Sequence, residues 1–189
     1  DTYLFGRGDG ADTIYDQDST PGNVDIIRFK DGVRPGDVTL SRPASESSAL
    51  WLSINGTADA LRIYGWFEST SNRVERVEFA DGAVWDVAKL MTAPILGTAG
   101  NDTLEGRDDL ADVVVGNDGN DWLRGFAGND TFYGGNGVDQ ILGDGGDDFL
   151  DGGAGNDTLY GGSPFNDGLG NDTYLFGRGD GADTIYDQD

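Results

Sequence analysis

A nine-residue pattern repeats between Gly97 and Tyr160 and constrains the fold of this chain more than any other feature. Glycine recurs at positions 1, 2 and 4, aspartate at position 6 and an apolar residue at position 8, as in GGAGNDTLY at residues 152–160. Glycine reaches positive φ without steric cost, so each repeat combines a tight turn with a short strand. Together with 32 glycines and 37% apolar residues, the pattern predicts an all-β fold and excludes a helical bundle.

Negative charge is concentrated in these repeats. The formal net charge is −23, of which −17 falls on residues 97–189 and −6 on residues 1–96. Nucleic acids and anionic membranes would be repelled by such a surface, so we expect neither as a partner, and a bound cation is favoured. The chain has no cysteine and no histidine, which excludes zinc–thiolate sites, imidazole metal sites and His-based catalytic triads.

Two signals of membrane targeting are missing from the sequence. No apolar run approaches the roughly 18 residues that a membrane span needs. The first residues also lack the basic and apolar segments of a secretion signal. We therefore expect no membrane insertion.

An eighteen-residue sequence occurs twice without a single change, at residues 1–18 and again at residues 172–189. A duplication of this length does not arise by chance. We therefore expect the chain to be one unit of a longer tandem array with a period of 171 residues, within a very large parent protein.

The chain divides into three parts. Residues 1–18 are interpreted as the closing turn of a preceding repeat block, with Asp12 at position 6. Residues 19–92 lose the glycine pattern and alternate apolar and polar residues, which predicts a small, mainly antiparallel β domain. Residues 97–189 form the repeat block, in which residues 161–166 are expected to form an irregular loop.

Residues 19–92 carry clear strand signals. Leu50–Ile54 and Leu61–Ile63 flank Asn55-Gly56, which predicts a hairpin with a type I′ turn. Further strands are expected at Val24–Phe29, Val38–Leu40 and Val74–Phe79, and a short helix at Asp86–Met91. The large aromatic residues favour a small core, with an aromatic groove for sugars as the alternative. They are Trp51, Trp66, Phe67 and Trp85.

In the repeat block, two units must complete one coil of a right-handed parallel β-roll, because each six-residue turn reverses the direction of a three-residue strand. Loops then stack every 18 residues, with strands about 4.8 Å apart. The position-6 aspartates fall into two columns: Asp102, Asp121, Asp139, Asp157 and Asp183 in one, and Asp112, Asp130, Asp148 and Asp172 in the other. The inward position-8 residues are Leu104, Val114, Leu123, Phe132, Ile141, Leu150, Leu159, Tyr174 and Ile185.

Stacked carboxylates would repel each other unless a cation lies between them. Calcium takes six to eight oxygen ligands and accepts backbone carbonyls, which glycine-rich turns expose. We therefore expect calcium to bind the side chains of the nine aspartates in the two columns and of Asp12. One ion between each pair of stacked loops gives about seven ions. The carbonyl ligands would come from loops around Gly100, Gly116, Gly119, Gly125, Gly128, Gly134, Gly137, Gly143, Gly146, Gly152, Gly155, Gly170, Gly179 and Gly181.

Two departures from the pattern modify this expectation. Residues 106–115 are one residue longer than a repeat and lack the position-4 glycine, so the sites at Asp112 are expected to be the weakest. Acids outside position 6 are expected to cap turns instead of binding calcium. They are Asp108, Asp118, Asp144, Asp147 and Asp151.

The repeat block resembles the hemolysin-type calcium-binding (RTX) repeats of exported bacterial proteins. The sequences VDIIRFKDGVRPGDVTLSRP, LRIYGWF and VERVEFADGAVWD resemble the hemolysin-type calcium-binding-related domain that accompanies such repeats. The resemblance implies a parallel β-roll, export by a type I secretion system, and folding in calcium outside the cell.

The sequence thus predicts a secreted, calcium-binding structural repeat, part of an adhesin or a surface-layer-like rod. The alternative is a calcium-dependent carbohydrate-binding accessory module of a type I secreted enzyme. We expect no catalytic residues, no cofactor besides calcium, and contacts with neighbouring repeats and the secretion machinery. Edge strands at the two ends would also favour head-to-tail self-association.

Overall fold

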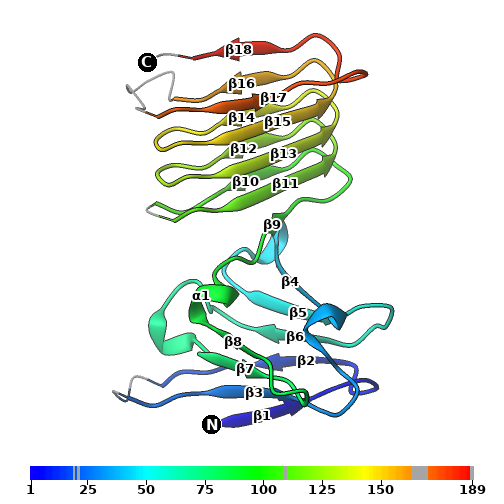
Figure 1. Cartoon of the computed structure of the whole chain (residues 1–189), viewed down its shortest axis with the longest axis vertical. Coiled ribbons are helices and arrows are strands. Elements are labelled where there is room, and N and C mark those ends of the chain that lie inside the picture. The colour runs from blue at the N-terminus through cyan, green and yellow to red at the C-terminus, as the bar shows by residue number, and fades with distance from the viewer. Residues whose placement is uncertain (19, 21, 109, 163–169, 188–189) are drawn as a thin grey trace. The chain divides into compact units, whose positions relative to one another are not determined.

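The regular secondary structure of the computed structural model is almost entirely short β-strand, which confirms the predicted all-β class (Figure 1). It describes residues 1–18, 20, 22–108, 110–162 and 170–187. The chain separates into two units, Asp1–Ala93 and Pro94–Asp189. The boundary lies between the segments that the sequence separates as 19–92 and 97–189.

The first unit contains two sheets and short helical turns. Its strands are β1 (Thr2–Phe5), β2 (Ala11–Ile14), β3 (Ile26–Phe29), β4 (Val38–Pro43), β5 (Leu50–Ile54), β6 (Ala60–Ile63), β7 (Arg76–Glu78) and β8 (Val84–Asp86). The helical turns are η1 (Pro35–Asp37), η2 (Ala44–Glu46), η3 (Thr70–Asn72) and α1 (Val87–Leu90). The helix α1 begins after Asp86, whose side chain accepts the backbone N–H of Lys89 and caps it.

Strand pairing in this unit is mixed. One sheet has the order β1-β3-β7-β8, and β4-β5-β6-β2 follow one another in the second. The pairs β4–β5, β5–β6 and β7–β8 are antiparallel and β3–β7 is parallel, so residues 19–92 are mainly antiparallel, as predicted. Residues 1–18 add two parallel pairs, β1–β3 and β2–β6. Strands β1 and β2 therefore belong to the first unit.

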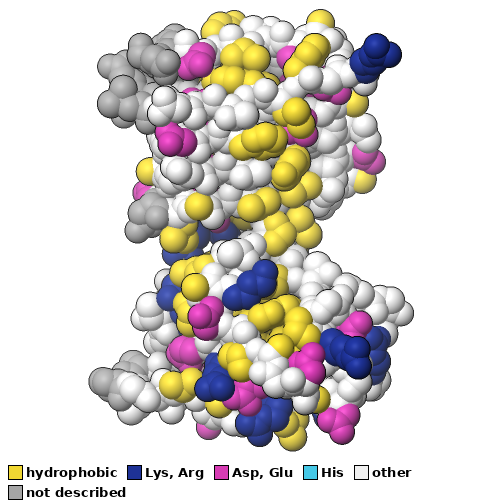
Figure 2. All heavy atoms as spheres, viewed as in Figure 1, with side chains coloured by type: hydrophobic (Ala, Val, Ile, Leu, Met, Phe, Trp, Pro, Cys, Tyr) yellow, Lys and Arg dark blue, Asp and Glu magenta, His cyan; other side chains and the backbone are white. Residues whose placement is uncertain are grey.

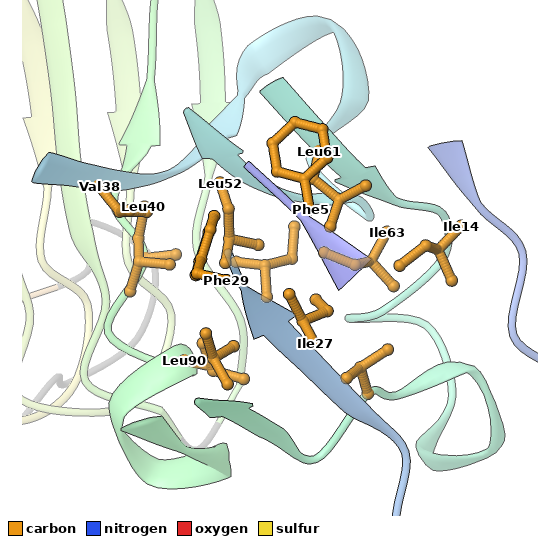
Figure 3. Packing of buried hydrophobic residues seen from close by; sticks show 14 of the residues in the cluster. Phe5, Ile14, Ile27, Phe29, Val38, Leu40, Leu52, Leu61, Ile63 and Leu90 are labelled. Carbon is orange, nitrogen blue, oxygen red and sulfur yellow. The ribbon is translucent and has the colours of Figure 1, made fainter. Parts of the chain in front are cut away.

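Apolar side chains from both sheets meet in one core (Figure 3). Leu50, Leu52 and Ile54 alternate with less buried residues along β5, as a strand with one face toward a core requires. Trp66 is fully buried and Phe67 is 5% exposed, so these aromatic residues form core, not a sugar groove. Trp85 packs against the same core.

The hairpin β5–β6 is present, but its predicted type I′ turn is wrong. Gly56 has a φ of 75°, whereas Asn55 is not among the residues with positive φ. The backbone N–H of Ile54 donates to the carbonyl of Asp59, and Thr57 Oγ1 donates to the carbonyl of Ile54 at 2.8 Å. The Ile54–Asp59 bond therefore closes a longer loop than two residues, and both the backbone N–H and the hydroxyl of Thr57 bond to the carbonyl of Ile54 inside it.

The second unit is a parallel β-roll, as predicted. Its strands are β9 (Ile95–Leu96), β10 (Thr103–Glu105), β11 (Val113–Asp118), β12 (Trp122–Arg124), β13 (Thr131–Asn136), β14 (Gln140–Leu142), β15 (Phe149–Ala154), β16 (Thr158–Tyr160), β17 (Thr173–Leu175) and β18 (Thr184–Tyr186). One sheet has the order β10-β12-β14-β16-β18, and β9, β11, β13, β15 and β17 pair in succession in the other. All described pairs in this unit are parallel.

Position-8 side chains stack inside the roll. Leu104, Leu123 and Ile141 lie in register in one sheet, and Val114, Phe132 and Leu150 in the other. Each of these six side chains is at most 1% exposed. The last coil differs, because Tyr174 is only partly buried and Ile185 is 48% exposed. The predicted irregular loop at 161–166 lies mostly outside the described residues.

Candidate metal centre

The position-6 aspartates form two columns in the roll, which we call the first and the second aspartate ladder. The first ladder consists of Asp102, Asp121, Asp139, Asp157 and Asp183, and the second of Asp112, Asp130, Asp148 and Asp172. Within each ladder, the backbone N–H of one aspartate donates to Oδ1 of the next at 2.7–2.9 Å. These ladders have the members predicted from the sequence; four of the seven steps span 18 residues, and the other three span 19, 24 and 26.

The other carboxylate oxygen has no hydrogen-bond partner in the middle of the ladders. Oδ2 is buried and unpartnered in Asp121, Asp130, Asp139, Asp148 and Asp157. These five side chains are at most 3% exposed. An unpaired buried carboxylate oxygen is costly, because the charge loses its hydration and gains nothing in return. The five Oδ2 atoms therefore favour either a proton or a bound cation.

Glycine at position 1 shapes the space beside each Oδ2. A Cβ at Gly116 would collide with Oδ2 of Asp121 and with the carbonyl oxygen of Gly134, which belongs to the next coil. At Gly106 the same Cβ would lie 3.0 Å from Asp112 Oδ2 and 2.8 Å from the carbonyl oxygen of Gly125. A carboxylate oxygen and a carbonyl oxygen from successive coils thus face one space that only glycine leaves open.

Glycine at position 4 permits the coils to approach closely. Gly137 has a φ of 139°, and a Cβ there would collide with the carbonyl oxygen of Gly119 in the preceding coil. The same relation holds between Gly146 and the carbonyl oxygen of Gly128. Among the predicted loop carbonyls, those of position-1 glycines such as Gly134 therefore lie beside the carboxylates, and those of position-4 glycines such as Gly119 lie against the next turn. Gly179, at position 2, belongs to neither set.

Burial raises the pKa of the inner ladder carboxyls. The pKa rises from 3.8 to about 6 in Asp130 and Asp139, and to about 7 in Asp148, chiefly through loss of hydration and secondarily through neighbouring carboxylates. The pKa values of Asp121 and Asp157 are also raised by burial. These groups are held where the ionised form is disfavoured unless a cation compensates it.

The ladder ends differ from the middle. Asp112 Oδ2 accepts the backbone N–H of Arg107 at 2.7 Å, and Asp102 Oδ2 accepts the backbone N–H of Thr98 at 2.6 Å. Protein donors already bond to these two oxygens. This agrees with the predicted weak site at Asp112 and indicates a second weak site at Asp102. Asp12 lies in the first unit, is exposed, and is in register with Leu61. The structure therefore brings nine of the ten predicted aspartates together and leaves Asp12 apart.

Two further sets of bonds between coils, one along each aspartate ladder, were missed by the sequence analysis. Position-5 side chains accept backbone N–H groups from the following coil, as Asn120 Oδ1 does from Val138 and Asn129 Oδ1 from Asp147. Asp147 Oδ1 accepts the backbone N–H of Asn171 in the same way. Asp147, which the sequence predicts as a turn cap, therefore joins two coils. The recurrence of asparagine directly before the position-6 aspartate was the available signal.

Asp144 also departs from the predicted turn-capping role. It is 8% exposed, has a φ of 69°, and pairs through Oδ2 with Arg124, whose guanidinium lies 4.2 Å from the ring centre of Phe126. Its Oδ1 has no hydrogen-bond partner, and its charge raises the pKa of Asp130 and Asp148. Asp144 is therefore an additional buried acid beside the second ladder.

Carboxylates do not gather in larger clusters. Among the residues that the structure describes, no group of three or more acidic side chains is arranged to hold a metal ion. A site between two coils would hence use at most two aspartates and complete its ligand shell with carbonyls. Figure 2 shows Asp and Glu only as scattered side chains on one face, in keeping with burial of the ladders.

No helix in the described residues is long and apolar enough to cross a membrane.

Comparisons with known proteins agree with this geometry. Residues 95–110, 108–141 and 133–163 match the family described as RTX calcium-binding nonapeptide repeat (4 copies). Residues 50–89 match the haemolysin-type calcium binding protein related domain. The iron-regulated protein FrpA of Neisseria meningitidis serogroup C is 37% identical over 106 residues, which cover 54% of this chain and 9% of that protein. The chain is therefore similar to RTX proteins: it joins a segment that matches the haemolysin-type calcium binding protein related domain to a segment that matches RTX calcium-binding nonapeptide repeats.

Proposed function

We propose that this chain is a structural module whose roll folds when calcium fills the two aspartate ladders. The observation that carries the proposal is the set of five buried Oδ2 atoms without a hydrogen-bond partner. Calcium supplies the positive charge and the coordination that these oxygens lack. The chain does the rest: the hydrogen bond to Oδ1 orients each carboxylate, and the position-1 glycines keep the adjoining space open.

The number of sites follows from the ladders. Seven hydrogen-bonded aspartate pairs join successive coils, four in the first ladder and three in the second. One ion for each pair gives about seven ions, with those at Asp102 and Asp112 bound most weakly. Isothermal titration calorimetry measures this stoichiometry.

Calcium supply would then determine where the chain folds. Where calcium is scarce, the buried acids stay uncompensated, and a chain of this charge favours the unfolded state. That state suits export through a type I secretion channel. At extracellular calcium about tenfold above the dissociation constant, each site adds about 1.4 kcal/mol of stability. We therefore infer that the protein is secreted and folds outside the cell.

A structural role in an adhesin or a surface-layer-like rod is the function that these features support best. The two ladders run along a stack of coils, and the position-8 side chains supply only a thin core, so calcium would stiffen an extended array. Copies are also proposed to associate head to tail at high calcium, which light scattering tests. The chain contains no histidine or cysteine, and we propose that it is not an enzyme.

A calcium titration followed by far-UV circular dichroism tests the proposal, with magnesium as the control ion. Asp121→Ala and Asp139→Ala should shift the gain of β signal to higher calcium. Asp118→Ala is the matched control, because Asp118 is exposed and outside both ladders. A spectrum that neither calcium nor chelator changes would show that the fold does not depend on the ion.

A further inference from the structure

The duplicated segment, residues 1–18 and 172–189, packs against different neighbours in its two copies. In the first copy, β1 pairs with β3 and β2 pairs with β6. In the second copy, β17 pairs with β15 and β18 pairs with β16. All four strands lie at the edge of their described sheet. One sequence therefore has two observed partners, a first unit and a roll, and each copy has one edge unpaired.

The two packings use different backbone groups. In the first copy, the carbonyls of Asp1, Phe5, Gly10 and Ile14 accept N–H groups of the first unit at 2.8–3.0 Å. Their equivalents in the second copy are Asp172, Phe176, Gly181 and Ile185. The roll instead bonds to Thr173, Asp180, Thr184 and Tyr186 of the second copy. Because neighbouring residues of a parallel strand bond to opposite sides, both packings can exist on one segment at once.

Side chains divide in the same way. Phe5 is 2% exposed on the first unit, whereas the equivalent Phe176 is 60% exposed on the roll. Ile14 is 5% exposed and the equivalent Ile185 is 48% exposed. These two apolar side chains are therefore buried only by a first unit. Phe176 directly follows the edge strand β17 and Ile185 lies on the edge strand β18, so each of these edges presents an apolar side chain without a described partner unit.

Polar groups show the complementary division. Asp183 Oδ1 accepts the backbone N–H of Asp157 in the roll, whereas the equivalent Asp12 is exposed. Conversely, Asp59 of the first unit accepts the backbone N–H groups of Gly8 and Gly10 at 2.9 and 2.8 Å. The duplicated segment thus carries one set of groups for a roll and another for a first unit.

We propose that the outer face of the second copy is a docking surface for another copy of the first unit, which follows it on the same chain. Its β3 and β6 pair with β17 and β18 in the register seen at β1 and β2. Phe176 and Ile185 then enter the core of that unit, and one segment serves as the last coil of a roll and the first coil of the next unit. A tandem chain is consequently continuous through this segment and contains no linker there.

The test is a tandem chain in which residues 1–189 are followed directly by residues 19–189. Val77 is fully buried, and Val77→Cys in the appended copy alone gives that unit a unique thiol, because the chain has no cysteine. Thiol labelling in excess calcium then reports the opening of that unit. We expect slow labelling in the parent tandem chain. Phe176→Ala in the segment that joins the two copies should accelerate labelling at least about tenfold.

Controls separate docking from a general loss of stability. In the 189-residue chain carrying Val77→Cys, Phe5→Ala should accelerate labelling and Phe176→Ala should not. Leu175→Ala should leave the tandem chain unchanged, because Leu175 is 50% exposed and its equivalent Leu4 is 63% exposed. If the Val77→Cys chain fails to fold, Ile27→Cys serves as the reporter instead, because Ile27 is also fully buried. Fast labelling of the parent tandem chain, or no response to Phe176→Ala, overturns the proposal.

Discussion

Replacing Asp139 by asparagine would separate the cost of a buried charge from the benefit of calcium. Asp139 is 1% exposed, and its Oδ1 accepts the backbone N–H of Asp121 at 2.8 Å while Oδ2 has no partner. Asparagine keeps the shape of the side chain and an oxygen for the same hydrogen bond. It removes the negative charge and replaces Oδ2 with an amide donor. This donor would lie beside the space shared with the carbonyl oxygen of Gly152.

The magnitude follows from the raised pKa of Asp139. The pKa is about 6 in the folded state against an ordinary value of 3.8. At neutral pH the ionised carboxylate therefore costs the folded state about 3 kcal/mol. Without calcium, Asp139→Asn should raise the free energy of unfolding of the roll by up to that amount. With calcium tenfold above its dissociation constant, the variant should forgo about 1.4 kcal/mol for each site that Asp139 serves.

Urea unfolding followed by circular dichroism measures both effects, once in chelator and once in excess calcium. The variant should have the higher midpoint in chelator and the smaller gain from calcium. Asp118→Asn is the control, since this exposed aspartate bonds only to Asn136 among the described contacts, and both of its midpoints should match the parent. A lower midpoint of Asp139→Asn in chelator would refute the idea that the buried charge is uncompensated without calcium.

Three further results are expected. Without calcium, the roll should lose stability as the pH rises toward 7, because Asp148 has a folded-state pKa of about 7 and binds a proton more tightly in the folded state than in the unfolded state. Urea midpoints across this pH range measure the effect, and saturating calcium should remove the dependence on pH. Gly137→Ala should prevent the coils from stacking, judged by loss of β signal, whereas Gly36→Ala should not, because a Cβ at Gly36 meets no atom within 4 Å. Phe132→Ala should lower the free energy of unfolding by about 3–5 kcal/mol, and Tyr133→Ala, which is 41% exposed, by far less; denaturant titration compares them.

The ladders could be predicted from sequence because one geometric rule determines them. A strand pairs only with its neighbours, so a fixed spacing fixes which aspartates meet. The rule holds across the irregular region, where the spacing rises to 24 residues between Asp148 and Asp172 and to 26 between Asp157 and Asp183. The ladders therefore continue on both sides of the added residues.

Other features depend on partners that the spacing does not specify. The two oxygens of one carboxylate have different roles. Only the structure shows that the backbone N–H of Arg107 donates to Oδ2 of Asp112, whereas Oδ2 of Asp130 has no hydrogen-bond partner. The type I′ turn failed for a similar reason, since Ile54 bonds to Asp59 across the hairpin and the loop between them is longer than two residues. Local sequence also gives no sign that Asp144 turns inward to meet Arg124.

The same atoms explain why glycine and aspartate recur together. Oδ1 stabilises the stack by accepting a backbone N–H, and this bond draws the carboxylate into the interior, where Oδ2 loses its hydration. A larger residue at position 1 would fill the space that Oδ2 faces, so that no cation could reach the oxygen. Glycine at position 1 therefore permits calcium to compensate the charge that aspartate at position 6 brings inside. We therefore expect stacking and calcium dependence to be two effects of one carboxylate, because the ionised Oδ2 has no partner in the interior unless a cation lies beside it.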